Sequence, residues 1–245
     1  MIKRIAPDVE VIDITHGIPP QHVLQGALVL ANTVPYMPAG IHVAIVDPGV
    51  GSERKPVALR GSDGRVYVGP DNGLLLVAAD RLGGVTKAVE IAEEAYMLER
   101  ISHTFHGRDI FSPAAAHLAS GVDLGKLGPA LDPAALHRLQ VPEPSVGEAR
   151  IRATVLYIDR YGNVQLNLTA DHLTQVGIDP GARVEVEVGF ERYFASAART
   201  FADAHKGDIV LYEDAYANIA LAINRGDAAR MFAVQVGDEL RLTPA

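Results

Sequence analysis

The hydrophobic and polar positions in the first half of the chain follow two alternating patterns. Residues 22–34 (HVLQGALVLANTV) and 72–82 (NGLLLVAADRL) carry apolar side chains at the spacing of an amphipathic helix. Residues 41–47 (IHVAIVD) form a nearly continuous β-branched run, which is typical of a strand that is buried on both faces. Alternation of helices and strands predicts an α/β domain with a largely parallel sheet and flanking helices.

Three further elements are expected in this half. Residues 57–60 and 65–68 flank a glycine-bearing turn and predict a β-hairpin. Residues 107–120 predict a helix with Pro113 in its first turn or two. Residues 9–14 predict a strand.

The first residues of the chain have the pattern of a helix end. Residues 2–5 (IKRI) predict the last turn of a helix, which Pro7 and Asp8 terminate. Because no residues precede this turn to build or cap the helix, we expect the fold to lack a segment upstream.

The pattern changes near residue 141. Residues 141–150 (VPEPSVGEAR) are rich in Pro and Glu and predict a short, semi-rigid linker. Short strands separated by glycine-bearing turns follow, at residues 151–158, 164–168, 184–188, 209–214, 217–224 and 239–243. We therefore expect two domains, an α/β domain over residues 1–145 and an all-β, barrel-like domain over residues 151–245.

Composition narrows the classes of protein without selecting one. The chain has 245 residues, of which 48% are hydrophobic and 21% charged, so it can bury a sizeable core. A net charge of −8, with scattered Lys and Arg, argues against a nucleic-acid or anionic-membrane partner. The absence of cysteine excludes thiolate catalysis and cysteine metal sites and fits a cytoplasmic protein.

Polar side chains follow the predicted strands of the first domain. Asp47 ends the 41–47 strand and Arg54 comes seven residues later, whereas Asp71 follows the hairpin and His106 precedes the 107–120 helix. Because chemistry in α/β sheets gathers at the carboxyl ends of the strands, we expect these groups at one rim. Each residue alone also fits a turn cap or a helix-entry histidine.

A metal-dependent alternative uses some of the same residues. His103 and His106 are three residues apart, but the stretch is not predicted to be helical and has no obvious third ligand. A metal-dependent phosphoesterase would have to be built on Asp47, Asp71, His103, His106 and Asp109.

Six segments that occur in order along the chain form a more specific pattern than any single motif. They are DITHGIPPQ (13–21), VDPGVGSERKP (46–56), VGPDNG (68–73), TFHGRDIFSPAAAHLA (104–119), IDRYGNVQLNL (158–168) and YEDAYANIALAINRG (212–226). Together they resemble the S-adenosylmethionine (SAM) hydrolases, the adenosine-forming SAM hydroxide adenosyltransferases, which are related to the fluorinases and chlorinases. The resemblance covers essentially the whole chain.

The resemblance implies a fold, a reaction and an assembly. It implies an α/β domain followed by a barrel-like domain, and in-line attack of water on C5′ of SAM to give adenosine and methionine. It implies no metal and no cofactor, and a homotrimer whose sites lie at subunit interfaces. The family begins with a strand that ends in a T-D-F-G-like motif and a helix, and this chain begins about where that helix ends.

The resemblance also assigns catalytic residues by position. Asp47, Arg54 and His106 match the triad that handles the attacking water in the hydrolases. The halogenases have tyrosines at the positions of Asp47 and His106, and fluorinase has a serine at the position of Gly107. Thr104 and Gly107 match substrate-binding positions beside the triad.

The second domain supplies the other implied substrate contacts. Asp159 and Asn163 would contact the methionine and adenine ends of SAM, Tyr161 would stack on the ligand, and the backbone near Arg225 would border the adenine. Many hydrolases have a serine that holds the methionine carboxylate where this chain has Ala215. That departure leaves open a second hypothesis, a SAM- or adenosine-binding protein with little or no turnover.

Overall fold

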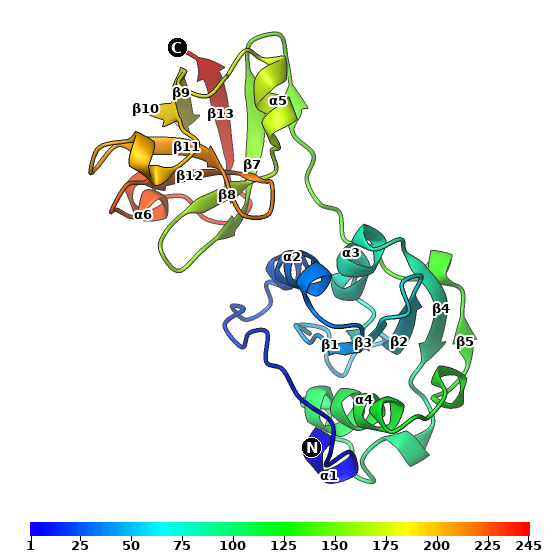
Figure 1. The fold of residues 1–245 in the computed structure, drawn as a ribbon. Helices are drawn as coiled ribbons and strands as arrows, with labels where there is room; N and C mark the ends of the chain where they lie inside the picture. Colours follow the sequence, from blue (N-terminus) through cyan, green and yellow to red (C-terminus); the bar gives the residue numbers. More distant parts are fainter. The chain divides into compact units, whose positions relative to one another are not determined.

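The computed structural model describes residues 1–245, and the contacts within the chain divide it into two compact units, Met1–Gln140 and Val141–Ala245. Figure 1 shows the helices and sheet of the first unit and the strands of the second. Each unit has a hydrophobic core of its own. None of the helices has the length and apolar character needed to cross a membrane.

The first unit is built on a five-stranded mixed sheet. Its strands lie in the order β1 (Ile41–Val43), β3 (Val66–Pro70), β2 (Pro56–Gly61), β4 (Val85–Glu90) and β5 (Ala130–Leu131). The expected α/β class is confirmed, but the sheet is mixed: β1 and β3 are parallel, and the other neighbouring pairs are antiparallel. The cause is the tight β2–β3 hairpin, which places a reversed strand between β3 and β4, although β1, β3 and β4 share one direction.

Helices cover both faces of this sheet. Figure 1 shows α2 (Val23–Thr33) and α3 (Leu74–Arg81) on one face and α4 (Ser112–Ala119) on the other, with α1 (Ile2–Ile5) packed against α4. Neighbouring residues of β2 point to opposite faces of the sheet. Leu59 packs in the core between the sheet and α2 and α3, and Ala58 packs in the core between the sheet and α4. This burial on two faces explains why the strands read as continuous apolar runs.

Short helical turns complete the first unit. They are η1 (Val34–Tyr36), η2 (Glu94–Tyr96), the π-helical turn η3 (Gly107–Phe111), η4 (Leu124–Lys126) and η5 (Pro133–Ala135). The helix expected over residues 107–120 is therefore the turn η3 followed by α4, and Pro113 lies in the first turn of α4 as expected. Residues 2–5, expected to be helical, form the four-residue helix α1.

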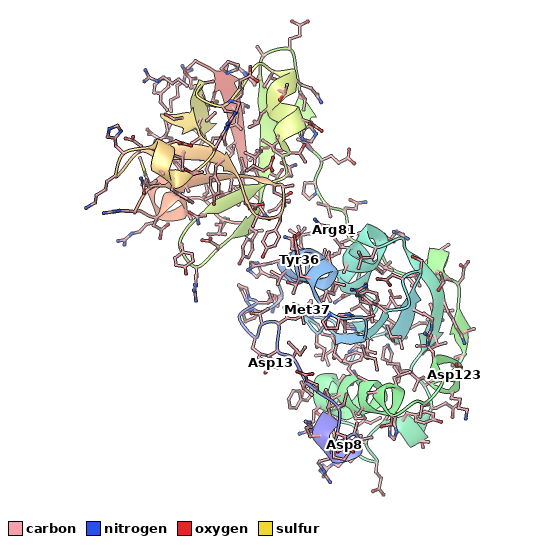
Figure 2. All side chains as sticks on the ribbon, viewed as in Figure 1. Asp8, Asp13, Tyr36, Met37, Arg81 and Asp123 are labelled. Carbon is pink, nitrogen blue, oxygen red and sulfur yellow. The ribbon has the colours of Figure 1, made fainter.

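The strand expected at residues 9–14 is absent. This segment has no regular secondary structure, and Val11 and Ile12 are 48% and 51% exposed. A groove of 680 Å³ is lined by the segment, by β1 and by residues of α2 and α4. Asp13, labelled in Figure 2, lies on this segment. The prediction was wrong because alternation alone does not make a strand without a neighbour to hydrogen-bond.

The second unit is a closed barrel of seven strands. Around the ring they are β7 (Ile151–Ile158), β8 (Val164–Leu166), β12 (Ile219–Ile223), β11 (Ile209–Glu213), β10 (Glu191–Ala197), β9 (Arg183–Val188) and β13 (Glu239–Pro244). The pairing of β13 with β7 closes the ring, and only β10 and β11 are parallel neighbours. The all-β, barrel-like class expected for this part of the chain is confirmed.

The second unit also contains short helices and one short strand outside the barrel. They are α5 (Ala170–Gln175), η6 (Phe201–Asp203), α6 (Ala228–Phe232) and β6 (Ser145–Val146), which pairs with β7 beyond the end of β8. Within the 141–150 stretch the Pro142 carbonyl also accepts a hydrogen bond from Asn167 Nδ2 at 3.0 Å. Part of the expected linker is therefore bonded to the barrel.

Candidate active site

Asp47 is delivered by the chain that continues from β1. The carbonyl of Val46 accepts a hydrogen bond from Asn72 Nδ2 at 2.8 Å, which fixes the backbone directly before Asp47. The chain then turns through residues 48–51, with Gly51 at φ +79°. A Cβ on Gly51 would lie 2.7 Å from the carbonyl oxygen of His103, so glycine is required where this turn meets the 102–106 segment.

Arg54 binds the Asp47 carboxylate through two nitrogens. Its Nε donates to Asp47 Oδ1 at 2.9 Å, and its Nη2 donates to Asp47 Oδ2. Both side chains are almost fully buried, with 9% of Arg54 and 7% of Asp47 exposed. The guanidinium also lies over the ring of the fully buried Phe111, with Cζ 5.2 Å from the ring centroid. This paired, stacked geometry holds the guanidinium in a single orientation.

His106 completes the cluster. Arg54 Nη2 lies 3.0 Å from His106 Nδ1. Because arginine can only donate, Nδ1 accepts this bond and the neutral imidazole carries its proton on Nε2. Burial and then the charge of Arg54 lower the pKa of His106, against the opposing charges of Asp47 and Asp109. The structure therefore joins three of the four residues expected at one rim, Asp47, Arg54 and His106, and the histidine is neutral at pH 7.

Thr104 and Gly107 lie on either side of His106. The Thr104 amide donates to Ser102 Oγ at 3.2 Å, and its side chain is exposed. Gly107 begins η3, and a Cβ there would lie 3.3 Å from Ile45 Cδ1. The backbone at Gly107 is therefore close to the chain that leads to Asp47, which leaves little space for a side chain.

The residues of the metal-dependent alternative do not converge. Asp71 Oδ1 accepts the His137 amide at 2.9 Å, and burial raises the pKa of Asp71. Asp109 pairs with Arg108, and the side chain of His103 is exposed. No three His, Asp or Glu side chains are arranged to hold one ion. Asp71, which the sequence suggested as a site residue, therefore binds the backbone at His137 within the first unit.

In the second unit, Asp159 and Asn163 build a turn. Asp159 Oδ1 accepts the amides of Tyr161 at 2.8 Å and Asn163 at 3.0 Å, and Oδ2 accepts Asn163 Nδ2 at 2.8 Å. The ring of Tyr161 is 62% exposed at the tip of this β7–β8 turn. The side chains of Asp159 and Asn163, which were expected to contact the ligand, are thus hydrogen-bonded to each other and to the backbone of the turn, and the Tyr161 ring is exposed.

A second turn repeats this geometry, which sequence reasoning missed. Asp214 Oδ1 accepts the amides of Tyr216 at 2.8 Å and Asn218 at 3.0 Å in the β11–β12 turn. The signal in the sequence is a shared Asp-x-Tyr-x-Asn pattern, DRYGN at 159–163 and DAYAN at 214–218. Since β8 and β12 pair with each other, both turns lead into adjacent strands of the barrel.

The two remaining expected positions are exposed. Ala215 lies in the β11–β12 turn and offers no polar side-chain atom. Arg225 lies between β12 and α6 with φ +61°, a left-handed conformation that is unusual for a residue with a side chain.

These features define a class of two-unit enzyme, with a buried acid–base cluster on an α/β unit and a separate β-barrel that presents aromatic turns. The comparisons with known proteins give the class a name. The SAM hydroxide adenosyltransferase N-terminal domain matches residues 1–128, and the C-terminal domain of the same family matches residues 153–241. The chain belongs to the SAM hydroxide adenosyltransferase family, which confirms the resemblance described above.

Individual relatives span nearly the whole chain. It is 46% identical over 243 residues to the (R)-S-adenosyl-L-methionine hydrolase of Salinispora arenicola, covering 99% of this chain and 90% of that protein. It is 27% identical over 270 residues to the fluorinase of Actinopolyspora mzabensis, with 99% and 90% covered. The crystal structure of an uncharacterized conserved protein from Thermotoga maritima superposes with a TM-score of 0.90 at 34% identity, covering 99% and 92% of the two chains.

Proposed function

We propose that this protein hydrolyses S-adenosyl-L-methionine to adenosine and L-methionine. The observation that carries the proposal is the hydrogen-bonded Asp47–Arg54–His106 cluster, in a chain 46% identical to a relative named for this hydrolysis. The name of that relative specifies the (R) epimer at sulfur, and we propose the same preference here.

The reaction needs a positioned water more than a strong acid. SAM is a sulfonium cation, so when the C5′–S bond breaks, its electron pair goes to sulfur and methionine leaves as a neutral thioether. Water supplies the new C5′–O bond and must lie in line with the breaking bond. Positioning of this kind contributes about 7–11 kcal/mol in favourable cases.

The geometry separates the roles of the three side chains. Since His106 Nδ1 already accepts from Arg54, the free Nε2–H of His106 is a donor and orients the oxygen of the water. Asp47 keeps lone pairs beyond the two that Arg54 binds, so we assign the departing proton to this carboxylate. A weak base suffices, because the oxygen becomes strongly acidic once the C5′–O bond forms. Arg54 stays protonated and fixes both partners.

The remaining substrate contacts are proposals from the family resemblance. Tyr161 is exposed at the tip of a turn that Asp159 and Asn163 hold, and its aromatic ring suits stacking on a planar group. Arg160 lies over the same ring, with Cζ 4.8 Å from the centroid, so a stacked ligand would use the other face or displace Arg160. Arg225 and Ala215 would border the ligand, as would Thr104 and Gly107 beside the triad.

We further propose a homotrimer in which each substrate site takes residues from two subunits. The support is the family resemblance and the Pro-bearing stretch 141–150, which limits the reach of the second unit. The cytoplasmic location stays a prediction that cell fractionation tests.

One observation favours a second candidate, a SAM- or adenosine-binding protein with little turnover. Ala215 is exposed and lacks the hydroxyl that many hydrolases place on the methionine carboxylate. Calorimetry that detects SAM binding while no adenosine is released would support binding alone.

The experiment that tests hydrolysis uses each sulfonium epimer of SAM separately. We expect adenosine and methionine in equal amounts, faster from the (R) epimer, and oxygen from labelled water on C5′ of adenosine. The Asp47→Ala variant is the matched control, because it removes the assigned proton acceptor. Release of no adenosine by the wild-type protein, or label absent from C5′, overturns the proposal.

A further inference from the structure

A fully buried carboxylate lies beneath the segment that carries His106. Asp109 is 0% exposed, and Arg108 donates to it through Nε, to Oδ1 at 2.5 Å, and through Nη2, to Oδ2 at 3.0 Å. The amide of Ser102 also donates to Asp109 Oδ2, at 2.8 Å. Asp109 thus joins the end of the segment to its beginning across seven residues.

The backbone of Asp109 makes two more connections. Its carbonyl accepts the Leu98 amide at 2.9 Å, and its amide donates to the Phe105 carbonyl at 3.2 Å. Arg108 in turn stacks over the ring of Phe105, with Cζ 4.9 Å from the centroid. Four neighbours, at positions 98, 102, 105 and 108, are therefore bound by one residue.

His106 lies inside this bound segment. It directly precedes η3, the π-helical turn that contains Asp109, and such turns recur at functional sites. Burial does little to set the path of the segment before His106, since His103, Thr104 and Phe105 are all exposed. The direction of the His106 ring toward Arg54 thus depends on how the segment closes at Asp109.

We infer that Asp109 is a positioning residue for the reaction: its buried carboxylate fixes the 98–108 segment so that His106 Nδ1 meets the guanidinium of Arg54. The inference rests on the proposed hydrolysis. Asp109 touches neither water nor substrate in this role and acts through His106.

Asp109 also contributes to the electrostatics of the imidazole. The charged and titratable groups that face His106 are Arg54, Asp47, Asp109 and His103. The negative charge of Asp109 raises the pKa of His106, whereas burial and Arg54 lower it by more. Arg108 lowers the pKa of Asp109 itself, so the carboxylate stays ionised at pH 7. Neutralising Asp109 therefore lowers the pKa of His106 further.

The test is Asp109→Asn, which keeps the shape and removes the charge. We expect kcat for SAM to fall about tenfold to a hundredfold, the scale for a misplacement of about 1 Å, with KM nearly unchanged. We expect the acid limb of the pH–rate profile to move to lower pH. An NMR titration should show the same downward shift in the pKa of the His106 imidazole, a readout that is independent of turnover.

Asp123→Asn is the matched control. Asp123 likewise accepts a backbone amide, from Gly125 at 2.7 Å, and lies 3.7 Å from the Lys87 ammonium, but it is exposed. Asp123 is not among the charged groups that act on the pKa of His106, so the variant should leave kcat and the His106 titration unchanged.

Arg108→Lys keeps the inference testable if Asp109→Asn does not fold. The Arg108 side chain is half-exposed, and lysine retains the charge but not the paired hydrogen bonds. We expect a smaller loss of kcat with the His106 pKa little changed. Folded variants with wild-type kcat and a wild-type His106 titration would overturn the role of Asp109. A wild-type protein that releases no adenosine would instead count against the proposed hydrolysis.

Discussion

The β11–β12 turn of the barrel contains a strained backbone conformation at Ala217, which a single substitution should relieve. Ala217 has φ +62°, in the left-handed region, and its counterpart in the first turn is Gly162 at φ +80°. A residue with a Cβ costs about 1–2 kcal/mol in this conformation, whereas glycine pays no such penalty. We therefore predict that Ala217→Gly stabilises the second unit.

The expected magnitude is a difference of two opposing effects. Relief of about 1–2 kcal/mol is reduced by the greater entropy of glycine in the unfolded chain, about 0.5–1 kcal/mol. Ala217 is exposed, so no packing is lost. The net gain is about 0.5–1 kcal/mol, which corresponds to a rise in Tm of roughly 1–4 °C for a chain of this size.

Scanning calorimetry of the whole protein measures this prediction, with Ala215→Gly as the matched control. Ala215 is exposed in the same turn but has no positive φ, so the control pays the entropy of glycine with no relief of strain. Its Tm should fall. The reverse change, Gly162→Ala, should be strongly destabilising because its Cβ would lie 2.1 Å from Asp227 Oδ1. An unchanged Tm in Ala217→Gly, or an equal rise in Ala215→Gly, would refute the reasoning.

Three further predictions concern the reaction and the assembly. We expect kcat to fall by about two to four orders of magnitude in each of the variants Asp47→Ala, Arg54→Ala and His106→Ala. SAM binding measured by calorimetry should change little. Near-normal turnover in His106→Ala would remove His106 from the mechanism. Activity should require neutral His106, and burial and Arg54 lower the pKa of this imidazole below 6.5. A pH–rate profile should therefore show full kcat above pH 6.5 and a fall in kcat only as the pH drops through the lowered pKa of His106. Mixing His106→Ala subunits with Asn163→Ala subunits should restore some activity if sites are shared in a trimer, whereas an active monomer in sedimentation would contradict the shared site.

The sequence predicts those parts of the fold that local patterns determine. The helix α2, the β2–β3 hairpin and β7 begin and end within about two residues of their expected bounds, because periodicity and turn residues act over short distances. Residues 9–14 show the limit, since their pattern is that of a strand but they pair with no strand of the sheet. The strand β10 (ERYFASA) was missed for the opposite reason: it alternates poorly and is held by its neighbours β9 and β11.

The candidate site, like the fold, could be predicted from the sequence only in part. The order of motifs pointed to Asp47, Arg54 and His106, and the structure joins these three side chains in one hydrogen-bonded cluster. Their hydrogen-bond roles did not follow from it, since the tautomer of His106 depends on which ring nitrogen faces Arg54. Asp109 was also out of reach, because an Arg-Asp dipeptide reads as a solvated pair until its burial is known.

The charge of the cluster bears on the choice between water and halide. Asp47 and Arg54 neutralise each other and His106 is neutral, so the cluster carries no net charge to repel a sulfonium cation. An anion placed beside the Asp47 carboxylate would meet a repulsion of about 4 kcal/mol at 4 Å with an effective dielectric of 20, of which the Arg54 charge cancels part. Water meets no such repulsion and can donate to that same carboxylate. We therefore predict that high chloride yields no 5′-chloro-adenosine and that adenosine remains the only nucleoside product. Chromatographic detection of the chlorinated nucleoside would show that Asp47 does not exclude anions from the attacking position.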